Sequence, residues 1–249
     1  MSGHSKWAQI KRQKGVNDAK RGAIFTRLAR EIMVAAKQGG ADPGANFKLR
    51  LAIQRAKQSN MPNDNIDRAI AKATGTGESV SLDEFTYEGY GPGGTAVLVA
   101  VLTDNRNRTV SEVRHQFTRA GGNLGETGSV AWQFDAKGLI TVPVDGHDPD
   151  ELALKAIDAG ADDVQVVGEA VEVQTEPASL QAVREALESG GLEIENADFA
   201  MVPKLTVELD RKTAHQAMRL IEGLEELEDV QRVYSNADFT DEALETYAG

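Results

Sequence analysis

The chain contains no cysteine, which excludes disulfide bonds, thiolate metal sites and cysteine nucleophiles. Its four histidines, His4, His115, His147 and His215, are too scattered to form a metal-binding motif. The Gly-x-Ser-x-Gly motif of serine hydrolases is missing too. The sequence therefore predicts no cofactor, no metal and no enzymatic activity.

Long apolar runs are also missing. The longest covers residues 96–102, whereas a membrane helix needs roughly 20 apolar residues. Residues 2–9 are polar, so they do not form the apolar segment of a signal peptide. We therefore expect a soluble cytoplasmic protein that has no membrane partner.

Positive charge is concentrated at one end of the chain. Residues 1–75 contain 15 lysines and arginines against 5 acidic residues, and the remainder contains 12 against 34. A pI near 4.9 would argue against binding to nucleic acid. Phosphate attraction is local, however, so the charge of the basic segment matters more than the total. A basic N-terminal segment on an acidic body indicates a nucleic-acid partner.

The N-terminal part, residues 1–77, is predicted to be a helical domain. Residues 1–17 lack an apolar period and are interpreted as a mobile basic arm. Apolar residues then recur at helical spacing over about 18–38, 45–59 and 63–74, and Asn63 or Asp64 is the expected cap of the third helix. Three short amphipathic helices can bury one small core.

The body is predicted to contain two ferredoxin-like βαββαβ units, one inserted in the other. The first unit is split between residues 78–135 and 204–240. Its strands are expected at 95–103, 130–134, 205–209 and 230–234, after a preceding strand at 85–90, and a capping box of Thr109 and Glu112 opens its first helix. The inserted acidic unit covers residues 136–203, and residues 241–249 form a tail. The overall fold class is α+β multidomain.

The proposed nucleic-acid contacts are the cations of the arm and first helix, because each phosphate contact by such a side chain releases counterions. Trp7 either stacks on an unpaired base or packs on the helices. The candidate binding residues are Lys6, Trp7, Lys11, Arg12, Lys14, Lys20, Arg21, Arg27 and Arg30.

A second contact is possible at residues 103–109, which follow a buried strand and open a helix. Arg106 and Arg108 there could bind an anion at the helix N-terminus, or the segment could be ordinary capping and turn chemistry. The glycine-rich segment 89–94 leads into a strand and not into a helix, so it predicts a hairpin connection and not a phosphate loop. Segment 121–129 is interpreted as a structural turn, and acidic pairs such as Glu228–Asp229 as solvated surface.

Several long blocks of this sequence resemble the YebC/PmpR family. They are GHSKWAQIKRQKGVNDAKR, AIQRAKQSNMPNDNIDRAI, YEGYGPGGTAVLVAVLTDNRNRTVSEVRHQF, GGNLGETGSVAW and DVQRVYSNADF. The mitochondrial translational activator of cytochrome oxidase is similar, but because this sequence begins at the first block with no transit-peptide pattern, we expect a bacterial cytoplasmic member of the family. The resemblance implies three domains around a central cleft and a non-enzymatic regulator associated with nucleic acid.

The target remains open between two kinds of nucleic acid. The resemblance implies a DNA-binding transcriptional regulator, or a ribosome-associated translation factor that relieves stalling at proline-rich stretches. The third helix carries only Arg68 and Lys72 among several alanines, which predicts weak sequence selectivity on double-stranded DNA. A mobile basic arm suits ribosomal or transfer RNA. The oligomeric state is expected to be a monomer or a weak dimer.

Overall fold

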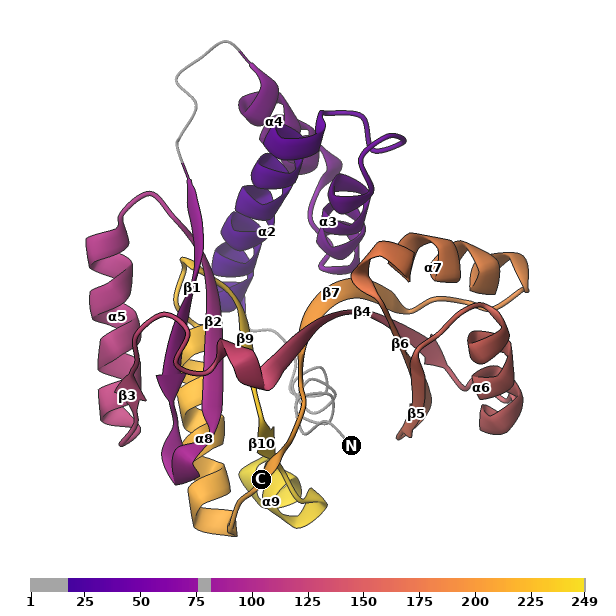
Figure 1. The fold of residues 1–249 in the computed structure, drawn as a ribbon. Helices are drawn as coiled ribbons and strands as arrows, with labels where there is room; N and C mark the ends of the chain where they lie inside the picture. The colour runs from indigo at the N-terminus through magenta and orange to yellow at the C-terminus, as the bar shows by residue number, and fades with distance from the viewer. Residues whose placement is uncertain (1–17, 76–81, 249) are drawn as a thin grey trace.

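The structure is a computed structural model that describes residues 18–75 and 82–248 (Figure 1). The predicted arm, with Lys6, Trp7, Lys11, Arg12 and Lys14, lies outside the described residues. The α+β class is confirmed, because a group of helices precedes two separate four-stranded sheets. In Figure 1 these helices stand above the two sheets.

The helical part consists of α2 (Asp18–Gly39), α3 (Phe47–Gln58) and α4 (Asn63–Thr74), close to the predicted ranges. Asn46 joins two of them. Its Oδ1 accepts a hydrogen bond from the N–H of Leu49 at 3.1 Å, and its Nδ2 donates to the carbonyl of Ala35 at 2.8 Å. Helix α4 is preceded by Pro62 and has no side-chain cap, so the prediction of Asn63 or Asp64 as cap is wrong. The shared core is aliphatic and includes Ile32, Leu49, Ala52, Ala56 and Ile66.

The first sheet has the order β3-β1-β2-β9. Its strands are β1 (Asp83–Tyr90), β2 (Ala96–Thr103), β3 (Asn123–Leu124) and β9 (Val230–Ser235). Strands β1 and β2 form an antiparallel hairpin across segment 91–95, as predicted. The helices α5 (Arg106–Arg119) and α8 (Arg211–Glu225) share a core with alternate residues of β2, and α9 (Asp241–Ala248) packs against α8.

Of two further predicted strands in this part of the chain, the one at 130–134 is wrong, and the one at 205–209 is present but shorter and outside the main sheet. Residues Ala131–Gln133 form a short 3-10 turn, because the backbone N–H groups of Val130 and Ala131 donate to the Glu88 carboxylate and not to a neighbouring strand. The segment predicted at 205–209 contributes β8 (Val207–Glu208), which pairs with β10 (Ala237–Asp238) in a separate two-stranded sheet. Strand β1 occupies a central position of the main sheet instead.

The second sheet follows the predicted βαββαβ order. Its elements are β4 (Phe134–Pro143), α6 (Pro149–Asp158), β5 (Asp163–Val167), β6 (Ala170–Thr175), α7 (Leu180–Ser189) and β7 (Asn196–Pro203). All of its strand pairs are antiparallel, in the order β5-β6-β4-β7. Both helices contribute to one aliphatic core with β4 and β6, which includes Ile140, Leu152, Val171 and Val183.

The helical part and the two sheets meet at a cluster of four charged side chains. Arg55 of α3 forms ion pairs with Glu31 of α2 and with Asp198 of β7. Arg232 of β9 bonds to the same two carboxylates, at 3.3 Å from Glu31 and 2.5 Å from Asp198. Burial alone would lower the pKa of Arg232, but the two carboxylates outweigh it and raise that pKa. This junction therefore fixes the helices against both sheets.

Within the described ranges, no helix is both long enough and apolar enough to cross a membrane.

Candidate nucleic-acid interface

Two of the predicted contact residues are engaged inside the protein. Arg27 of α2 donates from Nη1 to the carbonyl oxygens of Glu225, at 3.0 Å, and Val230, at 3.3 Å. Arg30, one turn later, forms ion pairs with Glu228 at 2.8 Å and Asp229 at 2.7 Å. Both side chains thus hold α2 against the turn between α8 and β9, where they serve the fold. Lys20 and Arg21 lie in the first turn of α2, and their side chains are outside the described part of the protein.

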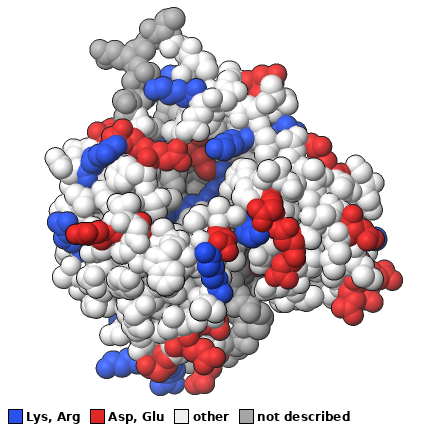
Figure 2. Space-filling model, viewed as in Figure 1, with Lys and Arg blue, Asp and Glu red and all other residues white. Residues whose placement is uncertain are grey.

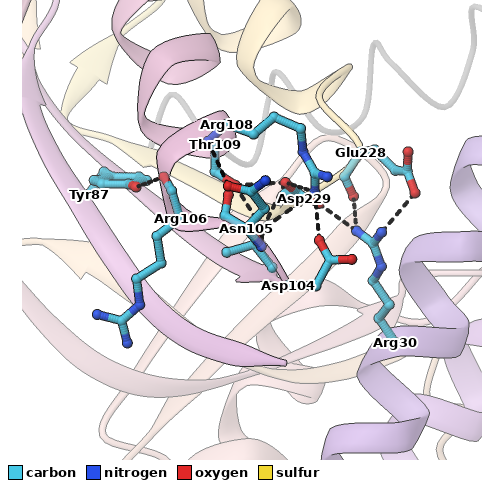
Figure 3. A network of polar contacts seen from close by, with 10 residues as sticks. Arg30, Tyr87, Asp104, Asn105, Arg106, Arg108, Thr109, Glu228 and Asp229 are labelled. Carbon is cyan, nitrogen blue, oxygen red and sulfur yellow. Dashed lines mark hydrogen bonds and ion pairs between the residues drawn. The ribbon is translucent and has the colours of Figure 1, made fainter. Parts of the chain in front are cut away.

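Asp229 is the centre of this contact, as Figure 3 shows. Its side chain is only 1% exposed, so the prediction that it is a solvated surface acid is wrong. Its two carboxylate oxygens accept hydrogen bonds from four other side chains. The donors are the hydroxyls of Thr103 at 3.0 Å and Thr109 at 2.7 Å, and the guanidinium groups of Arg108 at 2.7 Å and Arg30 at 2.7 Å.

These donors also set the pKa of Asp229. Burial alone would raise the pKa of this carboxyl group. The hydrogen bonds from Thr109, Arg108, Thr103 and Arg30 outweigh burial and hold the pKa of Asp229 below its ordinary value. The carboxylate is therefore charged at neutral pH and keeps both guanidinium groups in place.

The two arginines of the 103–109 segment do not converge on one site. Arg108 donates to Asp229 and, at 2.9 Å, to Asp104. Arg106 points away from this cluster (Figure 3) and forms an ion pair with Asp83 at 2.7 Å, over the ring of Phe85. The helix begins at Arg106 with Asn105 as its cap, so the predicted capping box of Thr109 and Glu112 is wrong. Arg106 is 63% exposed and remains accessible to an anion.

Other cations of the helical part are exposed. On α4, Arg68 and Lys72 are one turn apart and form no ion pair with another described residue. With Arg30 they line a cleft of about 500 Å³ between α2 and α4, whose apolar lining includes Phe25 and Met33. Among the side chains that the structure describes, the remaining exposed cations of this part are Lys37, Lys48 and Lys57. Sequence reasoning noticed Arg68 and Lys72 but could not separate accessible cations from cations that bond within the fold.

An exposed aromatic residue lies beside the glycine-rich loop 121–131. Glu88, only 5% exposed, accepts hydrogen bonds from the N–H groups of Gly128 at 2.6 Å, Val130 at 2.8 Å and Ala131 at 2.7 Å. Burial alone would raise the pKa of Glu88, but these three bonds outweigh it and lower the pKa. The loop so held presents Trp132, which is 67% exposed. Sequence reasoning missed this residue because it placed Trp132 inside a strand.

The fold and these charges define a class of protein. It is an α+β protein in which a basic helical part is joined by buried ion pairs to two acidic α/β units.

Comparison with known proteins identifies the family. Residues 5–76 match the family described as "TACO1/YebC protein N-terminal domain", and residues 82–237 match "TACO1/YebC second and third domain". The chain therefore belongs to the TACO1/YebC family, and the predicted resemblance is confirmed.

Individual relatives match over nearly their whole length. A probable transcriptional regulatory protein of Dehalococcoides mccartyi is 56% identical, with 99% of this chain and 98% of the relative covered. One from Pelotomaculum thermopropionicum is 55% identical, with 97% of this chain and 100% of the relative covered. The crystal structure of a conserved hypothetical protein from Aquifex aeolicus has a TM-score of 0.83 at 48% identity, covering 90% of this chain and 93% of that one.

The substitution Asp229→Asn tests the buried cluster. It keeps the shape of the side chain but leaves Arg30 and Arg108 without their shared charge, so we expect a loss of about 3 kcal/mol in the free energy of unfolding. Asp104→Asn removes the exposed partner of Arg108 and should change stability by less than about 0.5 kcal/mol. Urea unfolding at neutral pH measures both. Equal stability of the two variants would contradict the central role of Asp229.

The stability of the wild type and that of Asp229→Asn should also depend differently on pH. Because the pKa of Asp229 is lower in the folded than in the unfolded state, its stabilisation is complete above the unfolded value of about 3.9. It is lost as the pH falls further, through the folded value. Below about pH 4 the wild type should therefore lose stability with pH more steeply than Asp229→Asn. Parallel curves from urea unfolding would show that Asp229 does not contribute.

Proposed function

We propose that this chain is a non-enzymatic, nucleic-acid-binding regulator of gene expression, and that residues 1–75 make the contact. The observation that carries the proposal is the separation of charge. Residues 1–75 contain 15 lysines and arginines against 5 acidic residues, whereas 136–203 contain 3 against 15. A phosphate backbone is attracted to the first segment and repelled by the second. Figure 2 shows acidic side chains on the right, over the second sheet and its helices, and further acidic groups at the left and at the bottom of the molecule.

We propose double-stranded DNA as the first target. The relatives from D. mccartyi and P. thermopropionicum are named probable transcriptional regulatory proteins, which supports a regulator of transcription. In this proposal the exposed cations of α2, α3 and α4 contact phosphates together with the N-terminal arm. Lys37, Arg68 and Lys72 lie around adjoining clefts of α2 and α4, so a backbone could contact them together.

Structured RNA is the second candidate, and the composition of α4 favours it. A helix that reads the major groove needs side chains that contact base edges. Helix α4 instead exposes Asp64 and Asp67 beside Arg68 and Lys72, and a carboxylate cannot donate a hydrogen bond to the acceptors of the bases. Recognition of RNA by its shape does not require base-reading side chains on this helix. This alternative makes the protein a ribosome-associated translation factor.

The salt dependence of binding tests the proposal and separates the two targets. A labelled DNA duplex and a labelled RNA hairpin of equal length are titrated with the full chain over a range of salt concentrations. We expect the affinity for the physiological class to fall steeply with salt, by a logarithmic slope of about −0.7 to −0.9 per phosphate contacted. No binding to either probe, or a slope near zero, would refute nucleic-acid binding. Tighter binding of one probe at equal salt identifies the target.

The charge reversals Arg68→Glu and Lys72→Glu locate the contact. Both side chains are exposed and form no described ion pair, so the double variant should fold normally and bind at least about tenfold more weakly. Its salt dependence should also be shallower, because a surface that neutralises fewer phosphates releases fewer counterions. Lys155→Glu, an equally exposed reversal on α6, is the control and should bind as the wild type does. The control reverses one charge and the double variant two, so a control that loses about half the binding free energy lost by the double variant would indicate total charge and not a site on α4.

Deletion of residues 1–17 tests the contribution of the predicted arm. We expect most of the affinity to disappear, because the deletion removes Lys6, Lys11, Arg12 and Lys14. The matched control keeps the length of the chain and replaces only these four cations by glutamine. If the control binds as weakly as the deletion, charge is responsible. Affinity that survives both changes would refute the arm as a contact.

A further inference from the structure

The unit formed by residues 136–203 carries a strong negative charge that its own cations do not offset. It contains 15 acidic residues and 3 cations. Lys137 already forms ion pairs with Asp162 at 2.9 Å and Glu176 at 2.5 Å, and Arg184 with Glu188 at 3.0 Å. The surface of this unit therefore repels nucleic acid and attracts cationic partners.

The same unit exposes large apolar side chains. On α6, Leu154 is 64% exposed and Ile157 is 55% exposed, and on β5 Val166 is 45% exposed. They make up three of the five large hydrophobic residues that are exposed in the described part of the protein. Single exposed apolar residues are normal, so the question is whether these three lie near one another.

These three residues lie on the same side of the second sheet. Val166 is paired with Val171 across β5 and β6, and paired residues of an antiparallel ladder point to the same face. Val171 is buried in the core that also contains Leu152 and Ala156 of α6. The exposed residues of α6 and Val166 are therefore close to one edge of the unit, where Figure 1 places α6 beside β5.

Exposed carboxylates lie at both ends of α6, next to its exposed apolar residues. Asp150 and Glu151 belong to its first turn and Asp158 to its last, and Lys155 is the one exposed cation of this helix. An apolar centre with a charged rim is the usual anatomy of a protein–protein interface. Here the rim is acidic, so complementarity requires a basic partner.

We propose that Leu154, Ile157 and Val166, with these carboxylates, form a docking surface for a basic protein. The partner places apolar side chains on the three residues and lysines or arginines on the acidic rim. A second copy that docks through the same surface fits less well, because two identical acidic surfaces would repel each other. The proposal goes beyond nucleic-acid binding and does not depend on it, since the surface belongs to a different unit of the chain.

Nuclear magnetic resonance of the full, isotope-labelled chain tests this surface with a defined probe. The probe is a short peptide of lysine and leucine with the spacing of an amphipathic helix. A second peptide replaces each leucine by serine and keeps every lysine. We expect the first peptide to shift the amide signals of α6 and β5 and to bind about tenfold more tightly than the second, because burial of apolar side chains adds to charge attraction.

The double substitution Leu154→Ser and Ile157→Ser should weaken the first peptide about tenfold and leave the second unchanged. Leu205→Ser, at a residue 81% exposed outside this unit, is the control and should have no effect. Circular dichroism establishes that both variants fold. Equal binding of the two peptides, signals shifted elsewhere, or an equal weakening in the control would overturn the proposal. The proposal would also be overturned if the amide signals of α6 and β5 shifted on addition of an RNA hairpin, which would indicate RNA binding at this surface. A shift with protein concentration alone would indicate self-association and would overturn it as well.

Discussion

The arrangement of this protein depends on one buried carboxylate, that of Asp229. A charge removed from water is costly unless it is paired and hydrogen-bonded, and four side chains supply the bonds here. Arg30 comes from the helical part, and Thr103, Arg108 and Thr109 come from β2 and α5. Because these donors come from different elements, the carboxylate stabilises a particular placement of the helices on the first sheet and penalises others.

A consequence is that the basic residues of the helical part perform two different tasks. Arg27, Arg30 and Arg55 bond to carbonyl oxygens and carboxylates of the two sheet-bearing units. Arg68 and Lys72 stay exposed on α4, at a cleft that Arg30 lines as well. The sequence suggests that all of these cations belong to one binding surface. In the structure some of them bond within the fold, and others are exposed to solvent. The number of cations alone overestimates the number available to phosphate.

Local patterns were sufficient to predict the helices and the second sheet. The apolar stripe of residues 24–35 predicts α2, and alternating strands with two helices predict the βαββαβ order of residues 134–203. The strand order of the first sheet was not predictable, because it depends on pairing between strands far apart in the chain, such as β2 with β9. The turn at Ala131–Gln133 likewise depends on Glu88, whose carboxylate bonds to the backbone about 40 residues later along the chain. Asp229 was missed for the same reason. In the sequence it is one acid among many, and its partners are about 120 and 199 residues away.

The sequence predicts which segment of the chain carries the candidate interface, but it does not predict which side chains of that segment are accessible. Basic charge in residues 1–75 is visible in the composition, but which cations remain accessible depends on packing between distant elements. Trp132 is exposed in a 3-10 turn next to backbone that bonds to Glu88, and not in the strand that the local sequence predicts. The same holds for the acidic unit at 136–203. Its negative charge follows from its composition, whereas its exposed apolar residues are known only from the packing of α6.

The most direct test of this account is to crosslink the protein to nucleic acid in cells and to map the crosslinked peptides and the bound sequences together. The account predicts crosslinks in the peptides of the N-terminal arm and of α4, and none in residues 136–203. Promoter fragments among the bound sequences would identify a transcriptional regulator, and ribosomal or transfer RNA a translation factor. Crosslinks concentrated in residues 136–203, or no recovered nucleic acid, would contradict the central claim that the basic helical part is the nucleic-acid interface.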